Sequence, residues 1–448
     1  MTIVRVKPAQ CSQTNRSASL STNMSNANER GVKMEHNKVS GMRQSAFRRS
    51  VVALAATAAA SLVLSACGAA EGDSDGGENY TLGFIAPLSG AMAPLGTSML
   101  DGLHLAIDAA NADGGVHGRQ IVIQVEDNKG DPSSGVTAAR ALASKSIAVT
   151  GGIPAQLIDA EAPIFAREGV PYVVLGAGPA VLDPVQETLF MSDVPSSAQG
   201  QPMVEFAEEL LGRADFAAAI GPVDTPSGKE WGENVQELSA MSDFTITDSA
   251  PIPVTAADLS AQAQRLVAGS PDVILSQAPD VPLVPLVRKI RELGFDGPIV
   301  NFAQGSSSAP LMDLEDPEVY IFRTTAQYDP TSEQAGVKRF VELVDAADKA
   351  DLAMSQTQFS QSYVLGTILI AALEQCGPDC TKEDLTASLN DLTVDTEGFV
   401  PTPLVLTEDN HQATRAGVFY HWDGNGVVPA GDATPMPASA YTLEATLD

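Results

Sequence analysis

The chain has 448 residues, of which 44% are apolar and 18% are charged, and its formal net charge is −30. This length and composition predict a globular protein with two domains of about 100–200 residues each. The strong negative charge repels nucleic acid and anionic membrane surfaces, so it argues against both as partners.

Residues 42–66 have the features of an export signal. Arg43, Arg48 and Arg49 form a basic region, and an uncharged run rich in Ala, Leu and Val follows at 51–64. That run would span about 21 Å as a helix, less than the roughly 30 Å hydrocarbon core, which favours a signal peptide over a membrane-spanning helix. The letters L-S-A-C-G that end it resemble the lipobox of bacterial lipoproteins. The resemblance implies cleavage before Cys67 and stable anchoring through acyl chains on that residue.

The segments on either side of this signal are polar. Residues 1–41 are rich in Asn and Ser and have no apolar periodicity, so we expect a non-native extension with Met42 as the true start. A disordered cytoplasmic extension is the alternative. Removing residues 1–66 takes away nine basic and two acidic residues and moves the net charge to about −37. Residues 67–79 are rich in Gly, Asp, Glu and Ser and predict a flexible tether.

The stretch 80–127 predicts a strand, a helix and a second strand. An apolar run at 82–86 suits a strand that is buried on both faces. Thr97 or Ser98 is expected to cap the helix through a side-chain oxygen, because apolar residues recur at helical spacing after them. Alternating residues at 121–125 predict the second strand, which most simply lies parallel to the first.

Three motifs follow one another in the same stretch. They read P-L-S-G-x-x-A-x-x-G, then G-L-x-L-A-I-D-x-x-N-x-x-G-G-V-x-G, then V-E-D-x-x-x-D-P. In this order and spacing they resemble the opening of the Leu/Ile/Val-type solute-binding proteins of ABC transporters, which are type I periplasmic binding proteins. The resemblance extends over about residues 80–430.

The resemblance implies an α/β fold of two doubly wound lobes with parallel-rich sheets, joined by a three-segment hinge. Lobe 1 is expected at 80–197 and 327–413, and lobe 2 at 198–326 and 414–448. The residue pattern agrees, because short apolar runs alternate with helical patterns. Strands are expected at 147–150, 170–175, 216–220, 244–246, 272–275 and 298–302, helices from 132 and at 157–166, 202–211, 229–241, 261–267, 283–293, 333–348, 358–375 and 382–389, and a late hairpin from 417–422.

Two cysteines, Cys376 and Cys380, lie outside the N-terminal segments, in the sequence C-G-P-D-C. Their spacing does not fit a C-x-x-C redox or zinc site, and no second pair of ligands is present. In an oxidising compartment a local disulfide is favoured over free thiols. It would close a very short loop, so its effect on stability should be modest.

Four loops rich in Gly, Ser and Ala are expected to face a ligand-binding cleft, at 87–96, 151–156, 176–179 and 304–308. In an open α/β sheet, ligands bind beyond the C-terminal ends of the strands, near backbone N–H groups at helix starts. Tight turns without a ligand are the alternative for any one loop. The ligand-binding residues expected in these loops are Ser89, Leu95, Ala155, Gln156, Gly176, Ala177, Gly178 and Gln304.

Two residues of the second lobe complete the expected site. Trp231, in K-E-W-G-E-N, matches a position where the family often has an aromatic residue, whose ring could close over a ligand. Packing at a helix start is the alternative for Trp231. Asp280 could face the cleft and meet a ligand ammonium group.

The resemblance also implies a difference in ligand. Amino-acid-binding relatives hold the charged ends of the ligand with a Ser, a Thr and a Glu, and Ala155, Gly178 and Gln304 stand at these positions here. An ammonium group buried without its partner costs on the order of 3–5 kcal/mol. We therefore expect free leucine to bind weakly, with a less charged or differently charged small molecule preferred.

Support for catalysis is weak. The four histidines beyond the tether, His104, His117, His411 and His421, show no H-x-x-x-H or H-E-x-x-H pairing. The letters G-x-S-x-G occur at 72–76, inside the polar tether and not between a strand and a helix as in a nucleophile elbow, and no phosphate-binding G-x-x-x-x-G-K-[ST] loop occurs. The letters G-A-G-P-A-V from Gly176 lack the third glycine of a dinucleotide fingerprint. We expect no enzyme, no cofactor and no metal.

These features together predict a monomeric, lipid-anchored, extracytoplasmic solute-binding protein. It would capture a small amino-acid-like or amide-like solute by hinge closure. By resemblance, its partners are the permease and ATPase subunits of an ABC importer. A ligand-sensing receptor of the same fold is the first alternative, and an anchored hydrolase is a more distant one.

Overall fold

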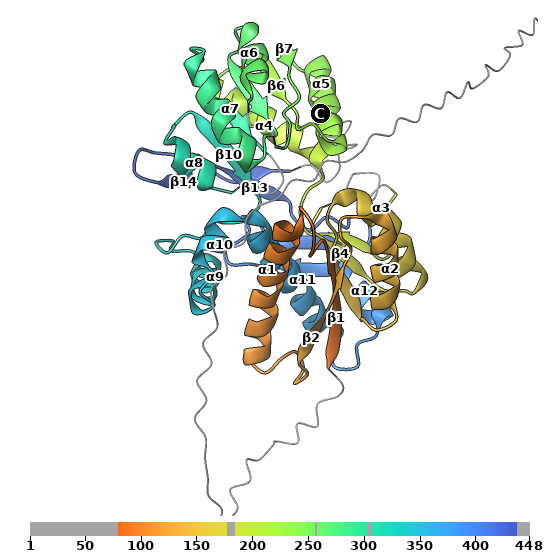
Figure 1. Cartoon of the computed structure of the whole chain (residues 1–448). Coiled ribbons are helices and arrows are strands. Elements are labelled where there is room, and N and C mark those ends of the chain that lie inside the picture. Colours follow the sequence, from red (N-terminus) through yellow and green to blue (C-terminus); the bar gives the residue numbers. More distant parts are fainter. Residues whose placement is uncertain (1–78, 177–183, 256–257, 303–306, 437–448) are drawn as a thin grey trace, which may run out of the picture. The chain divides into compact units, whose positions relative to one another are not determined.

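The computed structural model describes residues 79–176, 184–255, 258–302 and 307–436 (Figure 1). They contain a five-stranded sheet, an eight-stranded sheet and a two-stranded ribbon, with helices between the strands. The expected export signal, Cys67 and the tether lie outside the described residues. Within the described ranges, each helix is too short or too polar to cross a membrane.

The first sheet is entirely parallel and has the order β2-β1-β3-β4-β5. Its order reverses between β1 and β3, which lie side by side but are followed by connections in opposite directions. Such a reversal defines a doubly wound sheet. The strands are β1 (Tyr80–Ala86), β2 (Ile121–Asp127), β3 (Ala148–Gly151), β4 (Tyr172–Val174) and β5 (Leu189–Met191).

Helices cover both faces of this sheet, because its strands are apolar on both sides. Leu82 and Phe84 of β1 belong to one buried cluster with α1, α9, α11 and α12. Ile85 of β1 and Val149 of β3 belong to a second cluster with α2 and α3. The helices are α1 (Ala93–Ala112), α2 (Pro132–Ala143), α3 (Ala155–Arg167), α9 (Ala335–Ala346), α11 (Thr357–Cys376) and α12 (Lys382–Leu389).

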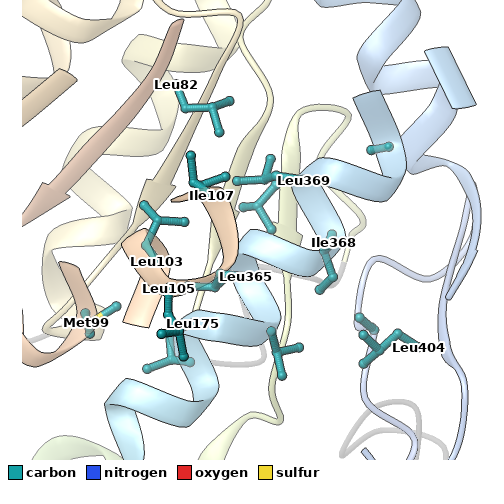
Figure 2. Close-up of a cluster of buried hydrophobic side chains, with 14 of the residues drawn as sticks. Leu82, Met99, Leu103, Leu105, Ile107, Leu175, Leu365, Ile368, Leu369 and Leu404 are labelled. Atoms are coloured by element: carbon teal, nitrogen blue, oxygen red, sulfur yellow. The ribbon is translucent and has the colours of Figure 1, made fainter. Parts of the chain in front are cut away.

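The helices α1 and α11 pack closely although about 250 residues separate them. Figure 2 shows Leu103 and Ile107 of α1 beside Leu365 and Leu369 of α11. Gly102 makes the close approach possible, since a Cβ atom there would collide with the carbonyl oxygen of Phe359. This contact completes the core on one face of the first sheet.

The second sheet repeats the winding of the first. Its parallel part has the order β7-β6-β8-β9-β10, and its order also reverses beside the first strand, between β6 and β8. The late hairpin then adds β13 antiparallel to β10 and β14 antiparallel to β13. The strands are β6 (Ala217–Gly221), β7 (Thr245–Ser249), β8 (Val273–Ser276), β9 (Ile299–Asn301), β10 (Val319–Arg323), β13 (Ala416–Trp422), β14 (Val427–Pro429) and the short β15 (Thr434–Pro435), which pairs with β13.

Buried clusters again lie on both faces of the second sheet. Ile220 and Leu275 pack with α4 and α5 on one face, and Ala219 and Ile274 pack with α6, α7 and α8 on the other. These helices are α4 (Gly200–Leu211), α5 (Pro226–Met241), α6 (Ser260–Ala268), α7 (Asp280–Glu292) and α8 (Ala309–Leu314). The prediction of two doubly wound α/β units is therefore confirmed.

The remaining elements connect the two sheets. The short 3₁₀ helix η2 (Ser196–Gln199) follows β5, and α10 (Ala350–Ser355) precedes α11. β11 (Asp391–Val394) and β12 (Leu404–Thr407) form the antiparallel ribbon. At the end of α11 the sulfur atoms of Cys376 and Cys380 are joined in a disulfide, with Cα atoms 5.4 Å apart.

Several boundaries differ from the prediction. Neither Thr97 nor Ser98 caps α1, which begins four residues before Thr97, at Ala93, with Pro94 in its first turn. Proline favours a helix start because its φ angle is already helical. The predicted helix from 229 likewise begins at Pro226, where the Thr225 side chain accepts a hydrogen bond from Gly228. The strands β5, β10, β11 and β12 and the helices α8 and α10 were not predicted.

Candidate functional site

The strands of each unit end at one edge, and the residues beyond that edge form the candidate site. In the first unit, Asp127 at the end of β2 holds the loop after β1. Its carboxylate accepts a hydrogen bond from the backbone N–H of Leu88 at 2.8 Å. Burial, which raises the pKa of Asp127, is outweighed by hydrogen bonds from Ser89, Leu88 and Lys129, so that the pKa is lowered. The loop is thus tied down by a charged side chain, while Ser89 stays exposed.

Backbone rather than side chains forms the edge after β3. Gly151 and Gly152 have φ angles of 118° and 75°, in the region that favours glycine. A Cβ atom on Gly151 would collide with the carbonyl oxygen of Ile85. The helix α3 then begins at Ala155 without a side-chain cap, and Gln156 beside it is exposed. A solute here would meet backbone N–H groups at a helix start.

A pair of buried amides lies at the edge of the second unit. Gln277 directly follows β8, and its Nε2 donates to Oε1 of Gln199 at 2.9 Å. Gln199 is 0% exposed and Gln277 is 3% exposed. Among the described residues, Gln199 Nε2 and Gln277 Oε1 have no hydrogen-bond partner. One donor and one acceptor are therefore buried and free to bind a polar group.

The loop that carries Gln277 is fixed by its neighbours. Asn301 at the end of β9 exchanges two hydrogen bonds with the backbone of Ala278, at 3.0 and 3.1 Å. Asp280 begins α7, and its carboxylate accepts from the backbone N–H of Ser307 at 3.0 Å and from the Ser307 hydroxyl at 2.5 Å. Asp280 thus joins the two loops of this edge.

A buried arginine lies behind the same edge. Arg323 is the last residue of β10 and is 3% exposed, and its Nη1 donates to Oγ of Ser308 at 3.0 Å. Ser308 Oγ in turn donates to Oε1 of Gln327, and Gln327 Nε2 donates to the carbonyl of Val427 at 3.1 Å. Ser308, Gln327 and Trp422 line a cavity of about 640 Å³. That volume is in the range of small-molecule pockets.

Hydrogen bonds also connect the segments that run between the two sheets. Asp193, just after β5, accepts from Nε2 of Gln361 in α11 and from Thr324, which follows β10. Thr414, just before β13, donates to the carbonyl of Ser192. Burial raises the pKa of Asp193 to about 6, against the hydrogen bonds from Thr324, Val194 and Gln361. Hydrogen bonds at Ser192 and Asp193 therefore join segments that lie far apart in the sequence, and their role as the hinge crossings stays a prediction.

The structure contradicts the predicted role of Trp231 as a ring over the ligand. Trp231 is 0% exposed in α5 and belongs to the buried cluster between the helices and the second sheet. Its Nε1–H has no acceptor among the described residues. The burial of the ring among apolar residues agrees with the alternative, packing at the helix start.

The other predicted residues fall into three groups. Ser89, Ala155 and Gln156 lie at the strand edge of the first unit with partial or full exposure, Leu95 is half-buried in the first turn of α1, and Gly176 is buried after β4. Their contact with a solute stays a prediction. Ala177, Gly178 and Gln304 lie outside the described residues.

The sequence reasoning did not find Gln199, Gln277 or Arg323. Gln277 stands in S-Q-A-P-D at the expected end of a strand, which was the one available signal. Within the described ranges, no three His, Cys, Asp or Glu side chains are arranged to hold a metal ion.

Comparisons with known proteins agree with this geometry. Leu/Ile/Val-binding protein BraC3 of Rhizobium johnstonii is 33% identical over 97 residues, which cover 20% of this chain and 25% of that protein. Leu/Ile/Val-binding protein homolog 7 of Brucella abortus is 25% identical over 299 residues, 63% of this chain and 74% of that protein.

Among solved structures, the fatty acid ABC transporter substrate-binding protein from Thermomonospora curvata has the same fold, with a TM-score of 0.66 and 20% identity. The match covers 80% of this chain and 92% of that one. The family model described as periplasmic binding protein matches residues 79–427. The chain therefore belongs to the periplasmic binding protein family.

Proposed function

We propose that the chain is the extracytoplasmic substrate-binding lipoprotein of an ABC importer. It captures a small solute between its two α/β units and presents it to a permease and its ATPase. Family membership supports a solute-binding role, and the curated relatives are named for binding leucine, isoleucine and valine.

The observation that carries this proposal is the repeated winding of the two sheets. Each sheet reverses its order beside its first strand, between β1 and β3 and between β6 and β8. Ligands of doubly wound sheets bind beyond the strand ends at such reversals. The loops found there are those with Asp127 and Ala155 in one unit and Gln277 and Asp280 in the other.

The chain connections support hinge closure as the mechanism. Three segments run between the sheets, and hydrogen bonds from Gln361, Thr324 and Thr414 gather them at Ser192 and Asp193. Short connections of this kind act as hinges by absorbing backbone rotation. A solute that contacts both units would then stabilise a closed form.

We further propose that free leucine is a poor ligand. Asp280, the expected substitute for the relatives' glutamate, already accepts hydrogen bonds from the N–H and the hydroxyl of Ser307. An ammonium group would have to share this carboxylate with Ser307. Acid-like or amide-like solutes do not depend on Asp280.

The test begins with a thermal-shift screen of amino acids, amides, polyamines and small acids against the full chain. Small-angle scattering with and without each stabilising compound should show a smaller radius of gyration at saturation. A compound that causes no thermal shift serves as the control. Saturable binding without any compaction would refute hinge closure, and sub-micromolar binding of leucine would refute the ligand preference.

The anchor has its own test. Cys67→Ala removes the thiol that would receive the diacylglyceryl group, so the chain should appear in the aqueous phase after detergent partitioning. The unmodified variant found in the membrane fraction would contradict the lipoprotein assignment.

A further inference from the structure

Arg323 occupies an unusual place for a charged residue. It ends β10, which is parallel to its neighbour β9, and β9 is in turn parallel to β8, so the three strands end at the same edge of the second sheet. Its side chain lies on the same face as Ile321 and Tyr420, because paired residues and residues two apart share a face of a sheet. With 3% exposure it is buried at the edge where this fold binds ligands.

The guanidinium has only part of its hydrogen bonds. Nη1 donates to Ser308 Oγ at 3.0 Å. In the part of the chain that the structure describes, Nε and Nη2 of Arg323 have no acceptor. These two nitrogens form one edge of the planar group and point two N–H bonds in nearly parallel directions. That edge is the one that binds a carboxylate through both of its oxygens.

Stability does not explain this arrangement. Burial lowers the pKa of Arg323, while Tyr420 and Asp280 act in the opposite direction. An arginine nevertheless keeps its proton at neutral pH. A buried cation without a bonded counter-ion destabilises a fold, and a neutral side chain of similar size would be better tolerated. Asp280, the nearby carboxylate, is engaged by Ser307.

We propose that Arg323 is the residue that recognises the solute, by binding a carboxylate group through Nε and Nη2. The inference rests on the proposed solute-binding function and names its substrate class: small organic monocarboxylates without an ammonium group. Ser308 fixes the guanidinium from the other side. Ser308 also lines the cavity of about 640 Å³ together with Tyr328 and Trp422, so the guanidinium is linked to that cavity through one hydrogen bond.

A single negative charge suits this site better than a phosphate or a dicarboxylate. Glu315 and Asp329 also line the cavity, and they would repel a second negative charge. One guanidinium edge donates its two hydrogen bonds to a single carboxylate. The competing explanation is an internal one, in which Asp280 leaves Ser307 and pairs with Arg323.

The experiment compares acids with their amides. Linear, branched and aromatic monocarboxylates, among them 4-methylpentanoate, are titrated into the full chain by calorimetry, each beside its primary amide and beside leucine. An acid should bind more tightly than its amide and more tightly than leucine. Arg323→Gln should weaken binding of that acid about 10- to 100-fold and leave the amide unchanged, because hydrogen bonds to a charged group are lost.

Two further variants separate recognition from folding. Arg323→Lys keeps the charge but not the pair of parallel N–H donors, so its affinity for the acid should lie between those of the unchanged protein and Arg323→Gln. Arg265→Gln removes an exposed arginine of the same unit, which pairs with Asp248, and should change nothing. Unliganded Arg323→Gln should unfold at the same or a higher temperature than the unchanged protein, since a buried unpaired charge has been removed.

Three results would overturn the inference. The first is an Arg323→Gln chain that binds the acid as tightly as before. The second is a less stable variant that loses acid and amide alike, which would assign Arg323 a structural pairing with Asp280. The third is an unchanged protein that binds neutral or cationic solutes but no acid, and here the proposed solute-binding function would stand. Only a failure to bind any solute of the wider screen would contradict that function itself.

Discussion

Both units bury a charged side chain, and they hold it differently. In the first unit, Glu161 of α3 accepts hydrogen bonds from the Tyr172 hydroxyl at 2.6 Å and from Asn128 Nδ2 at 3.2 Å. Burial raises its pKa to about 7, against these hydrogen bonds, so it is readily neutralised. In the second unit, Arg323 keeps its charge and has a partner on one nitrogen of three.

This difference indicates which unit recognises the solute. A buried group with all its partners serves the fold, whereas a buried group with missing partners at a strand edge is available to a ligand. The strand edges of the two units differ in the same way. Backbone at Gly151 and Gly152 forms the edge of the first unit, and side chains such as Gln277 and Arg323 form that of the second.

The largest expected effect is a loss of stability, and it tests the apolar cluster between the helices and the second sheet. Trp231→Ala should reduce the free energy of unfolding by about 3–5 kcal/mol, because a fully buried ring is deleted. Urea denaturation measures this value. Affinity for a solute found in the screen should change little, and Trp231→Phe, which removes an N–H without an acceptor in the described part of the chain, should cost about 1 kcal/mol. If Trp231→Ala keeps its stability but loses the solute, the ring contacts the ligand and this interpretation is wrong.

A smaller effect tests the backbone edge of the first unit. Gly151→Ala should destabilise the chain by about 2–4 kcal/mol, because the new Cβ collides with the Ile85 carbonyl at a φ angle of 118°. Gly90→Ala is the matched control, with a φ angle of 77° and open space around it, and should cost about 1 kcal/mol. Equal losses of stability in both variants would show that the close contact between Gly151 and the Ile85 carbonyl does not matter.

The smallest of these effects is a pH dependence. The pKa of Glu161 is about 7 in the folded chain and about 4.3 when unfolded. Its neutral form therefore favours folding fully below about pH 4.3, and this contribution is lost as pH rises through about 7. Relative to the Glu161→Gln chain, the unchanged protein should lose about 3 kcal/mol of stability between pH 4 and pH 8.5. If the free energy of unfolding changes with pH in the same way in both chains, the raised pKa assigned to Glu161 is wrong.

Much of the fold could be predicted from the sequence because it depends on local patterns. The apolar run of β1, the helical spacing of α1 and the glycines after it gave the first βαβ unit correctly, and the alternation of such units gave two wound sheets. Errors arose where tertiary packing decides. α1 begins at Ala93 with Pro94 in its first turn, and Gly96 lies so close to the carbonyl of Pro87 that a Cβ atom would collide with it.

The candidate site was harder to predict because its polar contacts are long-range. Gln199 and Gln277 are 78 residues apart, and their pairing depends on how two loops meet. Arg323 follows an apolar run, E-V-Y-I-F-R, that was not recognised as a strand, so its position at a strand end went unnoticed. Trp231 was assigned by position in a motif, whereas the direction of its side chain is set by the helix that carries it.

The packing of α1 against α11 has a consequence for the order in which the chain folds. The ribosome releases α1 early, but the apolar side of Leu103 and Ile107 meets its partner only after Leu365 and Leu369 have emerged. During that interval the whole parallel part of the second sheet is synthesised. The parallel part of the second sheet can therefore form before the core of the first unit is complete, and the uncovered apolar side of α1 favours aggregation until α11 has been made.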